Sequence, residues 1–111
     1  MNKKIYQIIK SKNKKKLVCL TAYSKPIAKI LDKFCDIVLV GDSLATAMYG
    51  MKNTHSVTLD TMIQHGVSVA SSINSAVCVV DMPAKSYKNV AIAKKNAKLI
   101  FKKTKCDAVK V

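Results

Sequence analysis

The sequence contains no arginine, no glutamate and no tryptophan. All twenty basic residues are lysines and all six acidic residues are aspartates, so the formal net charge is +14. A chain without arginine lacks the planar side chain that commonly reads bases, and few aromatic residues are present on which bases could stack. We therefore attribute the charge to codon bias in an AT-rich coding sequence and expect no specific nucleic-acid partner. A small basic module that binds RNA or anionic surfaces through lysine-rich ends, without catalysis, is an alternative from another class.

Long apolar runs and closely spaced cysteines are also missing. No run approaches the roughly 18 apolar residues that cross a bilayer, and residues 1–16 lack the apolar block of a signal peptide. The cysteines show neither a C-x-x-C pair nor zinc-ligand spacing to a histidine: Cys19, Cys35, Cys78 and Cys106. We therefore expect a cytoplasmic protein without membrane contact and with structural thiols. Cys19 and Cys78 lie in the most apolar runs and are expected to be buried.

Short apolar runs alternate with amphipathic stretches from residue 17 onward. The runs predict strands at residues 17–20, 37–40 and 77–80, and a fourth strand that begins at Ala108. Helical spacing predicts three helices, marked by these residues: Ile27, Ile30, Leu31 and Phe34; Met62, Ile63, Val67 and Ala70; Val90, Ala93, Ala97, Ile100 and Phe101. Continuously apolar strands that alternate with helices indicate a parallel sheet covered by helices. The predicted fold class is α/β.

The chain divides into a basic segment, residues 1–16, and an α/β part, residues 17–111. The basic segment holds seven lysines and no acidic residue. Within it, Ile5, Ile8 and Ile9 have the spacing of one short helix that could pack on the rest of the protein.

A weak internal repeat precedes two of the predicted strands. Cys35-Asp36 stands before the second strand, and Cys106-Asp107 stands in the same position before the fourth. A domain that ends inside such a strand would leave an unpaired edge without a covering helix. We therefore expect the sequence to be a truncated piece of a larger α/β protein.

Three charged residues stand where a parallel α/β fold places its ligand site, at the carboxyl ends of the strands. Asp42 and Asp81 follow neighbouring strands, and two carboxylates with water and a chelating substrate commonly hold magnesium. The alternative is that each aspartate caps the helix that follows it. Lys110 interrupts an apolar strand, so it either has a charged partner or lies on an exposed edge strand.

The connection after the second predicted strand is unusually long, from Gly41 to about residue 57. Such a length favours a functional lid, with Gly50 as its hinge. His55 and His65 are expected to lie at the surface or to support the site without touching the ligand.

From about residue 15 to the end, a series of motifs resembles those of one enzyme family, in the same order. The motifs are Thr21-Ala22-Tyr23, Val40-Gly41-Asp42-Ser43-Leu44, Ser56-Val57-Thr58-Leu59-Asp60-Thr61-Met62, Gln64-His65, Val80-Asp81-Met82-Pro83, Ser86-Tyr87 and Asp107-Ala108-Val109-Lys110. Together they resemble the amino-terminal part of ketopantoate hydroxymethyltransferase. The combination is specific, whereas any one of them alone would be weak.

The resemblance implies a (β/α)8 barrel, of which this chain would be the amino-terminal half, with about four parallel strands and their covering helices. It implies hydroxymethyl transfer from 5,10-methylenetetrahydrofolate to 3-methyl-2-oxobutanoate, which gives ketopantoate for pantothenate and coenzyme A synthesis. It also implies Mg²⁺ and a homodecamer of the full-length enzyme. By the same resemblance, Asp42 and Asp81 bind the metal and touch the substrate through it, whereas Ser43 and Lys110 hold the keto acid.

The family also has acidic residues that this sequence does not contain. An acidic residue two positions after the lysine and a glutamate base farther on would both lie beyond Val111, so no catalytic residue is assigned and the piece alone is expected to be inactive. A lyase or mutase of the phosphoenolpyruvate mutase and isocitrate lyase superfamily, which shares the barrel and a magnesium site for keto acids, is the closest alternative.

Overall fold

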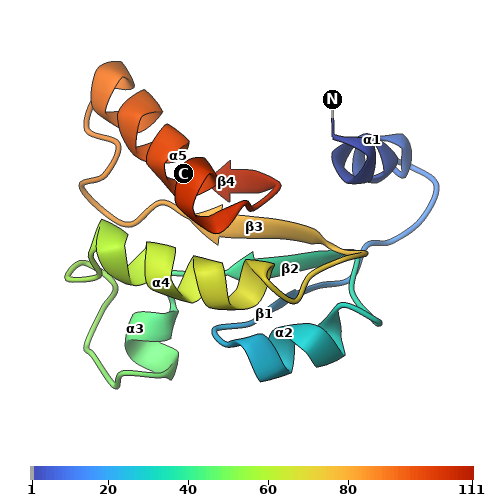
Figure 1. The fold of residues 1–111 in the computed structure, drawn as a ribbon, viewed down its shortest axis with the longest axis horizontal. Coiled ribbons are helices and arrows are strands. Elements are labelled where there is room, and N and C mark those ends of the chain that lie inside the picture. The colour runs from blue at the N-terminus through green and yellow to red at the C-terminus, as the bar shows by residue number, and fades with distance from the viewer. Residues whose placement is uncertain (1) are drawn as a thin grey trace.

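The computed structural model describes residues 2–111 as one parallel sheet with helices around it (Figure 1). The four strands lie side by side in the order of the sequence: β1 (Cys19–Thr21), β2 (Ile37–Val40), β3 (Val77–Asp81) and β4 (Ala108–Lys110). The helices are α1 (Lys3–Lys10), α2 (Lys25–Leu31), α3 (Leu44–Ala47), α4 (Leu59–Ala70) and α5 (Val90–Thr104). All three strand pairs are parallel, which confirms the predicted α/β class. Within residues 2–111, no helix combines the length and apolar character that a membrane crossing requires.

Local side-chain chemistry explains where the long helices begin and end. The Thr58 hydroxyl accepts a hydrogen bond from the backbone N–H of Thr61 at the start of α4. Asn89 does the same for Ile92 at the start of α5, and Lys105 ends that helix in the left-handed conformation with a φ of 61°. The two side-chain contacts satisfy backbone donors of the first helical turn, and the backbone N–H of Lys105 satisfies the Phe101 carbonyl oxygen at the end of α5.

The core lies between the two central strands and helices α4 and α5. Val38, Val80 and Ile100 have no exposed surface. Gly66 brings α4 close to its neighbours, because a Cβ atom there would lie 2.8 Å from Cγ2 of Thr104 and 3.2 Å from Cγ2 of Val80. The absent side chain therefore determines how closely α4 packs on α5 and β3.

The first strand and the helix after it are less buried than the sequence predicts. All three residues of β1 are exposed, including Cys19. Two residues of the predicted apolar helix face are exposed as well: Ile30 in α2, and Phe34, which lies beyond the end of α2. In this chain β1 is an edge strand with β2 as its sheet neighbour, and α2 buries only Ala28 fully. The prediction that Cys19 is buried is therefore wrong, whereas the prediction for Cys78 is confirmed; burial raises the pKa of the Cys78 thiol to about 12.

The repeated Cys-Asp pairs have the same structural role at the amino ends of the strands. Asp36 Oδ2 accepts the backbone N–H of Val18 at 2.9 Å, and Asp107 Oδ2 accepts that of Cys78 at 2.9 Å. Each aspartate thus stands before one strand and holds the start of the preceding strand in the sheet.

The basic amino-terminal segment covers this same end of the sheet (Figure 1). Nζ of Lys15 lies 2.7 Å from Oδ1 of Asp36, and that hydrogen bond is the main reason why the pKa of Asp36 lies below its usual value. Nζ of Lys4 lies 2.6 Å from Oδ2 of Asp107. Burial raises the pKa of Asp107, but hydrogen bonds from Lys4, from the Cys78 N–H and from Asn2 lower it by more.

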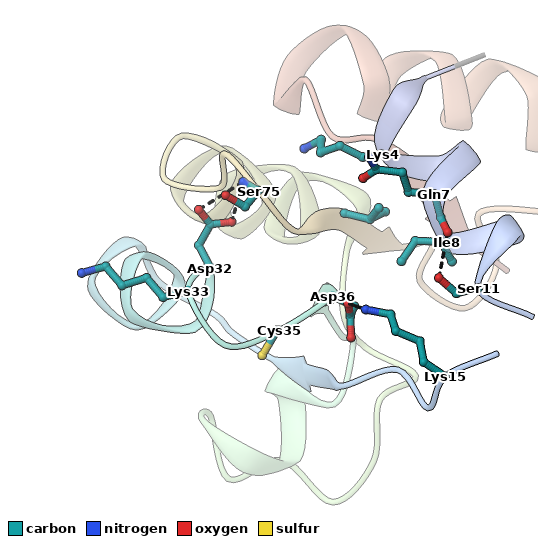
Figure 2. A pocket seen from close by; sticks show the side chains of 11 residues that line it. Lys4, Gln7, Ile8, Ser11, Lys15, Asp32, Lys33, Cys35, Asp36 and Ser75 are labelled. Carbon is teal, nitrogen blue, oxygen red and sulfur yellow. Dashed lines mark hydrogen bonds and ion pairs between the residues drawn. The ribbon is translucent and has the colours of Figure 1, made fainter.

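A pocket of about 310 Å³ lies between α1 and the starts of the strands (Figure 2). Its walls include Lys4 and Ile8 from α1 and Cys35 and Asp36 from the turn before β2. This pocket is at the opposite end of the sheet from the residues that the sequence singles out. In a parallel α/β fold, residues at this end of the strands usually stabilise the structure and do not take part in catalysis.

Asp32, at the end of α2, holds the loop that leads into β3. Its carboxylate accepts backbone N–H groups of Asn74 at 3.1 Å, Ser75 at 2.9 Å and Ala76 at 2.8 Å; Figure 2 shows its contact with Ser75. We expect Asp32→Ala to lower the free energy of unfolding by about 1–2 kcal/mol, because these N–H groups lose a charged acceptor. Urea unfolding monitored by circular dichroism measures the change.

Asp60→Ala is the matched control for that prediction. Asp60 is exposed, and among residues 2–111 its carboxylate accepts a hydrogen bond only from the side-chain amide of Gln64. Equal urea midpoints for the Asp32 and Asp60 variants would contradict the assignment of Asp32 as the anchor of this loop.

Candidate functional site

The carboxyl ends of β2, β3 and β4 bring three charged residues to one edge of the sheet. The register pairs Val40 with Val80 and Asp81 with Lys110, so Asp42 and Asp81 emerge next to each other. This edge is opposite α1 and next to α3 (Figure 1).

Asp81 lies at the centre of this group and is 4% exposed. Its Oδ2 accepts the backbone N–H of Asp42 at 3.1 Å. Its Oδ1 lies 2.9 Å from Nζ of Lys110, but the described residues give that buried oxygen no donor at a hydrogen-bonding angle. Oδ1 is thus in an ion pair and retains lone pairs that no protein donor satisfies.

The sequence leaves two possibilities for Lys110, a charged partner or exposure on an edge strand. In residues 2–111 it has both, because it is exposed on the edge strand β4 and is paired with Asp81. Its side chain is 55% exposed. The short contact with Asp81 is the main cause that raises its pKa; burial lowers the pKa by less, and the charges of Asp81 and Asp42 also raise it. Lys110 therefore presents a firmly protonated amine to the edge where the two aspartates lie.

Neither aspartate begins the helix that follows it. Ser43 is the residue before α3, and Asn89 caps α5. Asp81 accepts its backbone hydrogen bond from Asp42, in the loop after the neighbouring strand β2, instead of from a helix. The alternative that Asp42 and Asp81 cap the helices that follow them is therefore wrong.

Gly41 makes room for the close approach of the site residues. A Cβ atom at this position would lie 2.9 Å from Oγ of Ser43 and 3.6 Å from Oδ2 of Asp81. A larger residue would displace the Ser43 hydroxyl.

Ser43 has a hydrogen-bond partner that the sequence does not indicate. Its Oγ lies 2.9 Å from the hydroxyl of Tyr23, which comes from the loop after β1. The carbonyl oxygen of Tyr23 lies 2.7 Å from Nδ1 of His65, and Nε2 of His65 lies 2.8 Å from the hydroxyl of Tyr49. The available signal was the position of Tyr23 in the turn after the first strand, because that turn reaches the same edge.

The connection predicted as a lid is partly helical. It contains α3, and Gly50 follows with a φ of 66° in the left-handed region, where a Cβ atom would meet no neighbour within 4 Å. Glycine is needed there for its backbone conformation, because an L-residue is strained in that region. His55 lies exposed in this connection.

The donor set at this edge suits a hard divalent cation. Across residues 2–111, three or more histidine, cysteine or aspartate side chains do not gather anywhere as a metal site. Magnesium, however, is commonly held by one or two carboxylates, with water and substrate oxygens as its other ligands. Oδ1 of Asp81 is paired with Lys110 but accepts no hydrogen bond among residues 2–111, so it keeps lone pairs that fit this chemistry.

Comparisons with known proteins agree with the motifs. The sequence profile of the family named ketopantoate hydroxymethyltransferase matches residues 2–111. The chain is 54% identical over its whole length to 3-methyl-2-oxobutanoate hydroxymethyltransferase of Pelagibacter ubique (strain HTCC1062), of which it covers 43%. It is 50% identical over 96% of its length to the protein of that name in Anaplasma marginale (strain Florida), of which it covers 39%. The chain thus spans less than half the length of these curated relatives.

A solved structure supports the fold. The crystal structure of a phosphonopyruvate hydrolase complex with oxalate and Mg²⁺ superposes with a TM-score of 0.76 at 13% sequence identity. The match covers 98% of this chain and 38% of that one. Together with the order β1-β2-β3-β4, this confirms the fold as the amino-terminal half of a (β/α)8 barrel. On the evidence of its profile match and its relatives, the chain belongs to the ketopantoate hydroxymethyltransferase family.

Proposed function

We propose that these residues form part of the site of an enzyme that transfers a hydroxymethyl group from 5,10-methylenetetrahydrofolate to 3-methyl-2-oxobutanoate, giving ketopantoate for pantothenate and coenzyme A synthesis. The observation that carries the proposal is the grouping of Asp42, Asp81 and Lys110 at the carboxyl edge of the sheet, in a chain of this family. A keto acid carries a carboxylate and a polarisable carbonyl, and this edge offers an amine beside acidic groups.

Each side chain has a distinct role in this proposal. Lys110 pairs with the carboxylate of the keto acid, and the hydroxyl of Ser43 orients it by a hydrogen bond. Asp42 and Asp81 would hold Mg²⁺, which when bound stabilises negative charge that develops on the keto oxygen as the neighbouring carbon loses its proton. The contact with Asp81 keeps Lys110 protonated, so the amine is ready to bind an anion.

The division into a basic segment, residues 1–16, and a partial barrel, residues 17–111, is part of the proposal, as are a homodecamer of the full-length enzyme and a cytoplasmic location. A reducing compartment is in keeping with four free cysteines. The absence of a specific nucleic-acid partner stays a prediction from composition.

A chimeric enzyme tests the proposed function. In it, this chain replaces the matching segment of the Pelagibacter ubique relative, which supplies the rest of the barrel. We expect the chimera to exchange deuterium at the third carbon of 3-methyl-2-oxobutanoate and to form ketopantoate with 5,10-methylenetetrahydrofolate. The chain alone is expected to leave exchange at background, because it contains no glutamate to act as the base.

Two results would contradict the proposal. One is a folded chimera that neither exchanges deuterium nor forms ketopantoate while the unmodified relative does both. The other is carbon–carbon or carbon–phosphorus cleavage of a keto acid by the chimera, which would favour the lyase and mutase alternative. Exchange by the chain alone would disprove its expected inactivity.

A further inference from the structure

The half-buried ring of His65 connects three segments at the carboxyl edge of the sheet. We propose that His65 is a positioning residue for Ser43, which it holds in place through Tyr23 and Tyr49. The inference rests on the proposed function in one respect, namely that Ser43 contacts the keto acid.

The hydrogen-bond partners of His65 determine its tautomer. Its Nδ1 lies 2.7 Å from the carbonyl oxygen of Tyr23, and a carbonyl oxygen only accepts, so Nδ1 carries the proton. In the neutral ring Nε2 is then an acceptor, and the Tyr49 hydroxyl, 2.8 Å away, donates to it. The rings of Tyr49 and His65 also meet edge to face, with centroids 5.9 Å apart and planes at 78°.

These two contacts hold both ends of the segment that contains α3. At its start, Ser43 Oγ lies 2.9 Å from the Tyr23 hydroxyl, and the backbone of the same tyrosine is held by His65. At its end, Tyr49 follows α3 and is held by His65 directly. The four-residue helix is anchored in the core by Leu44 and Ala45, and the contacts of His65 fix the side chains that lie just before and just after it.

The Ser43 hydroxyl is therefore oriented by a chain of contacts that starts on α4. His65 lies on α4, which packs on β3 and α5 in the core, so it is a fixed point relative to the sheet. Tyr23 and Ser43 lie on loops, whose side chains need such support to keep one orientation.

Nuclear magnetic resonance of the 111-residue chain tests the tautomer without any assay of activity. Long-range proton–nitrogen correlations of the ring distinguish the two neutral tautomers. We expect His65 in the Nδ1–H form, with His55, which is exposed and lies in the connection before α4, as the internal reference for a solvated ring. Tyr49→Phe should shift the Nε2 signal of His65 and leave its tautomer unchanged. An Nε2–H tautomer at His65, or no response to Tyr49→Phe, would overturn the assignment.

The kinetic test uses the chimera with the Pelagibacter ubique relative. We expect His65→Phe to raise KM for the keto acid about tenfold, which corresponds to about 1.4 kcal/mol, with kcat changed less than about twofold. Tyr23→Phe, which removes only the hydroxyl that contacts Ser43, should have the same pattern. His65→Asn, whose amide can donate to the Tyr23 carbonyl from near the Nδ1 position, should restore most of the affinity.

Gln64→Ala is the control, since Gln64 is the exposed neighbour on α4 and contacts only Asp60 in the structure. An unchanged KM in His65→Phe would overturn the positioning role. So would a result in which His65→Phe lowers thermal stability and His65→Asn restores the stability but not the KM. If the chimera without substitutions is inactive while His65 has the Nδ1–H tautomer, the proposed function is wrong but the contacts of His65 are confirmed. If that chimera is active and His65→Phe leaves KM unchanged, only the positioning role of His65 is wrong.

Discussion

Replacing Asp81 with asparagine is expected to lower kcat/KM of the chimeric enzyme for the keto acid by about 10²–10³-fold, the size of effect seen when one preorganised electrostatic group is lost. The substitution keeps the shape of the side chain but removes the charge that faces Lys110 and would face a cation. Deuterium exchange at the third carbon of the substrate measures the loss independently of the folate.

The thermal stability of the same variant separates a functional role from a structural one. Asp81 is a buried carboxylate whose Oδ1 has no hydrogen-bond donor among residues 2–111. The melting temperature is not expected to fall by much, because asparagine can still accept the N–H of Asp42 and the Lys110 side chain, 55% exposed, remains solvated without its partner. Asp60→Asn, on the exposed face of α4, is the control and should leave exchange unchanged. A large fall in melting temperature for Asp81→Asn with exchange intact would show that Asp81 serves the fold alone.

The positions of the charged site residues could be predicted from the sequence because they depend only on topology. Neighbouring parallel strands end at the same edge of the sheet, so the residues at the ends of β2 and β3 lie near each other whichever way their side chains point. The contacts among Tyr23, Ser43 and His65 could not be predicted in this way, because they depend on the direction of each side chain and on the position of a loop. A helix as short as α3 also leaves no periodic signal to detect.

The prediction of the fold was accurate in the centre of the sheet and less so at its edges. The apolar runs of β2 and β3 are long enough to mark buried strands, and both are found where expected. An apolar run shows that a strand is present but not how many neighbours cover it, so the exposure of β1 and of Phe34, just after α2, could not be foreseen. The role of Asp32 was missed for another reason, since its partners are backbone groups more than forty residues away.

The close contact at Gly66 gives the largest expected effect on stability. Gly66→Val is expected to lower the free energy of unfolding by about 3 kcal/mol, because its Cβ atom alone would lie 2.8 Å from a Thr104 methyl group and 3.2 Å from one of Val80. Gly66→Ala should cost less, about 1 kcal/mol, since alanine favours a helix over glycine by about that amount and offsets part of the crowding. Urea unfolding of the two variants measures both values.

Thr104→Ser identifies the crowded atom. Serine removes the methyl group that lies nearest to Gly66, yet it keeps the hydroxyl that donates to the Ile100 carbonyl at 2.9 Å and accepts the Cys106 N–H at 3.1 Å. Combined with Gly66→Ala, it should recover stability, so that the double variant is more stable than the sum of the two single changes predicts. Strict additivity would mean that α4 relieves the contact by moving away from Val80 and the sheet, and the site residues that α4 supports would then move with it.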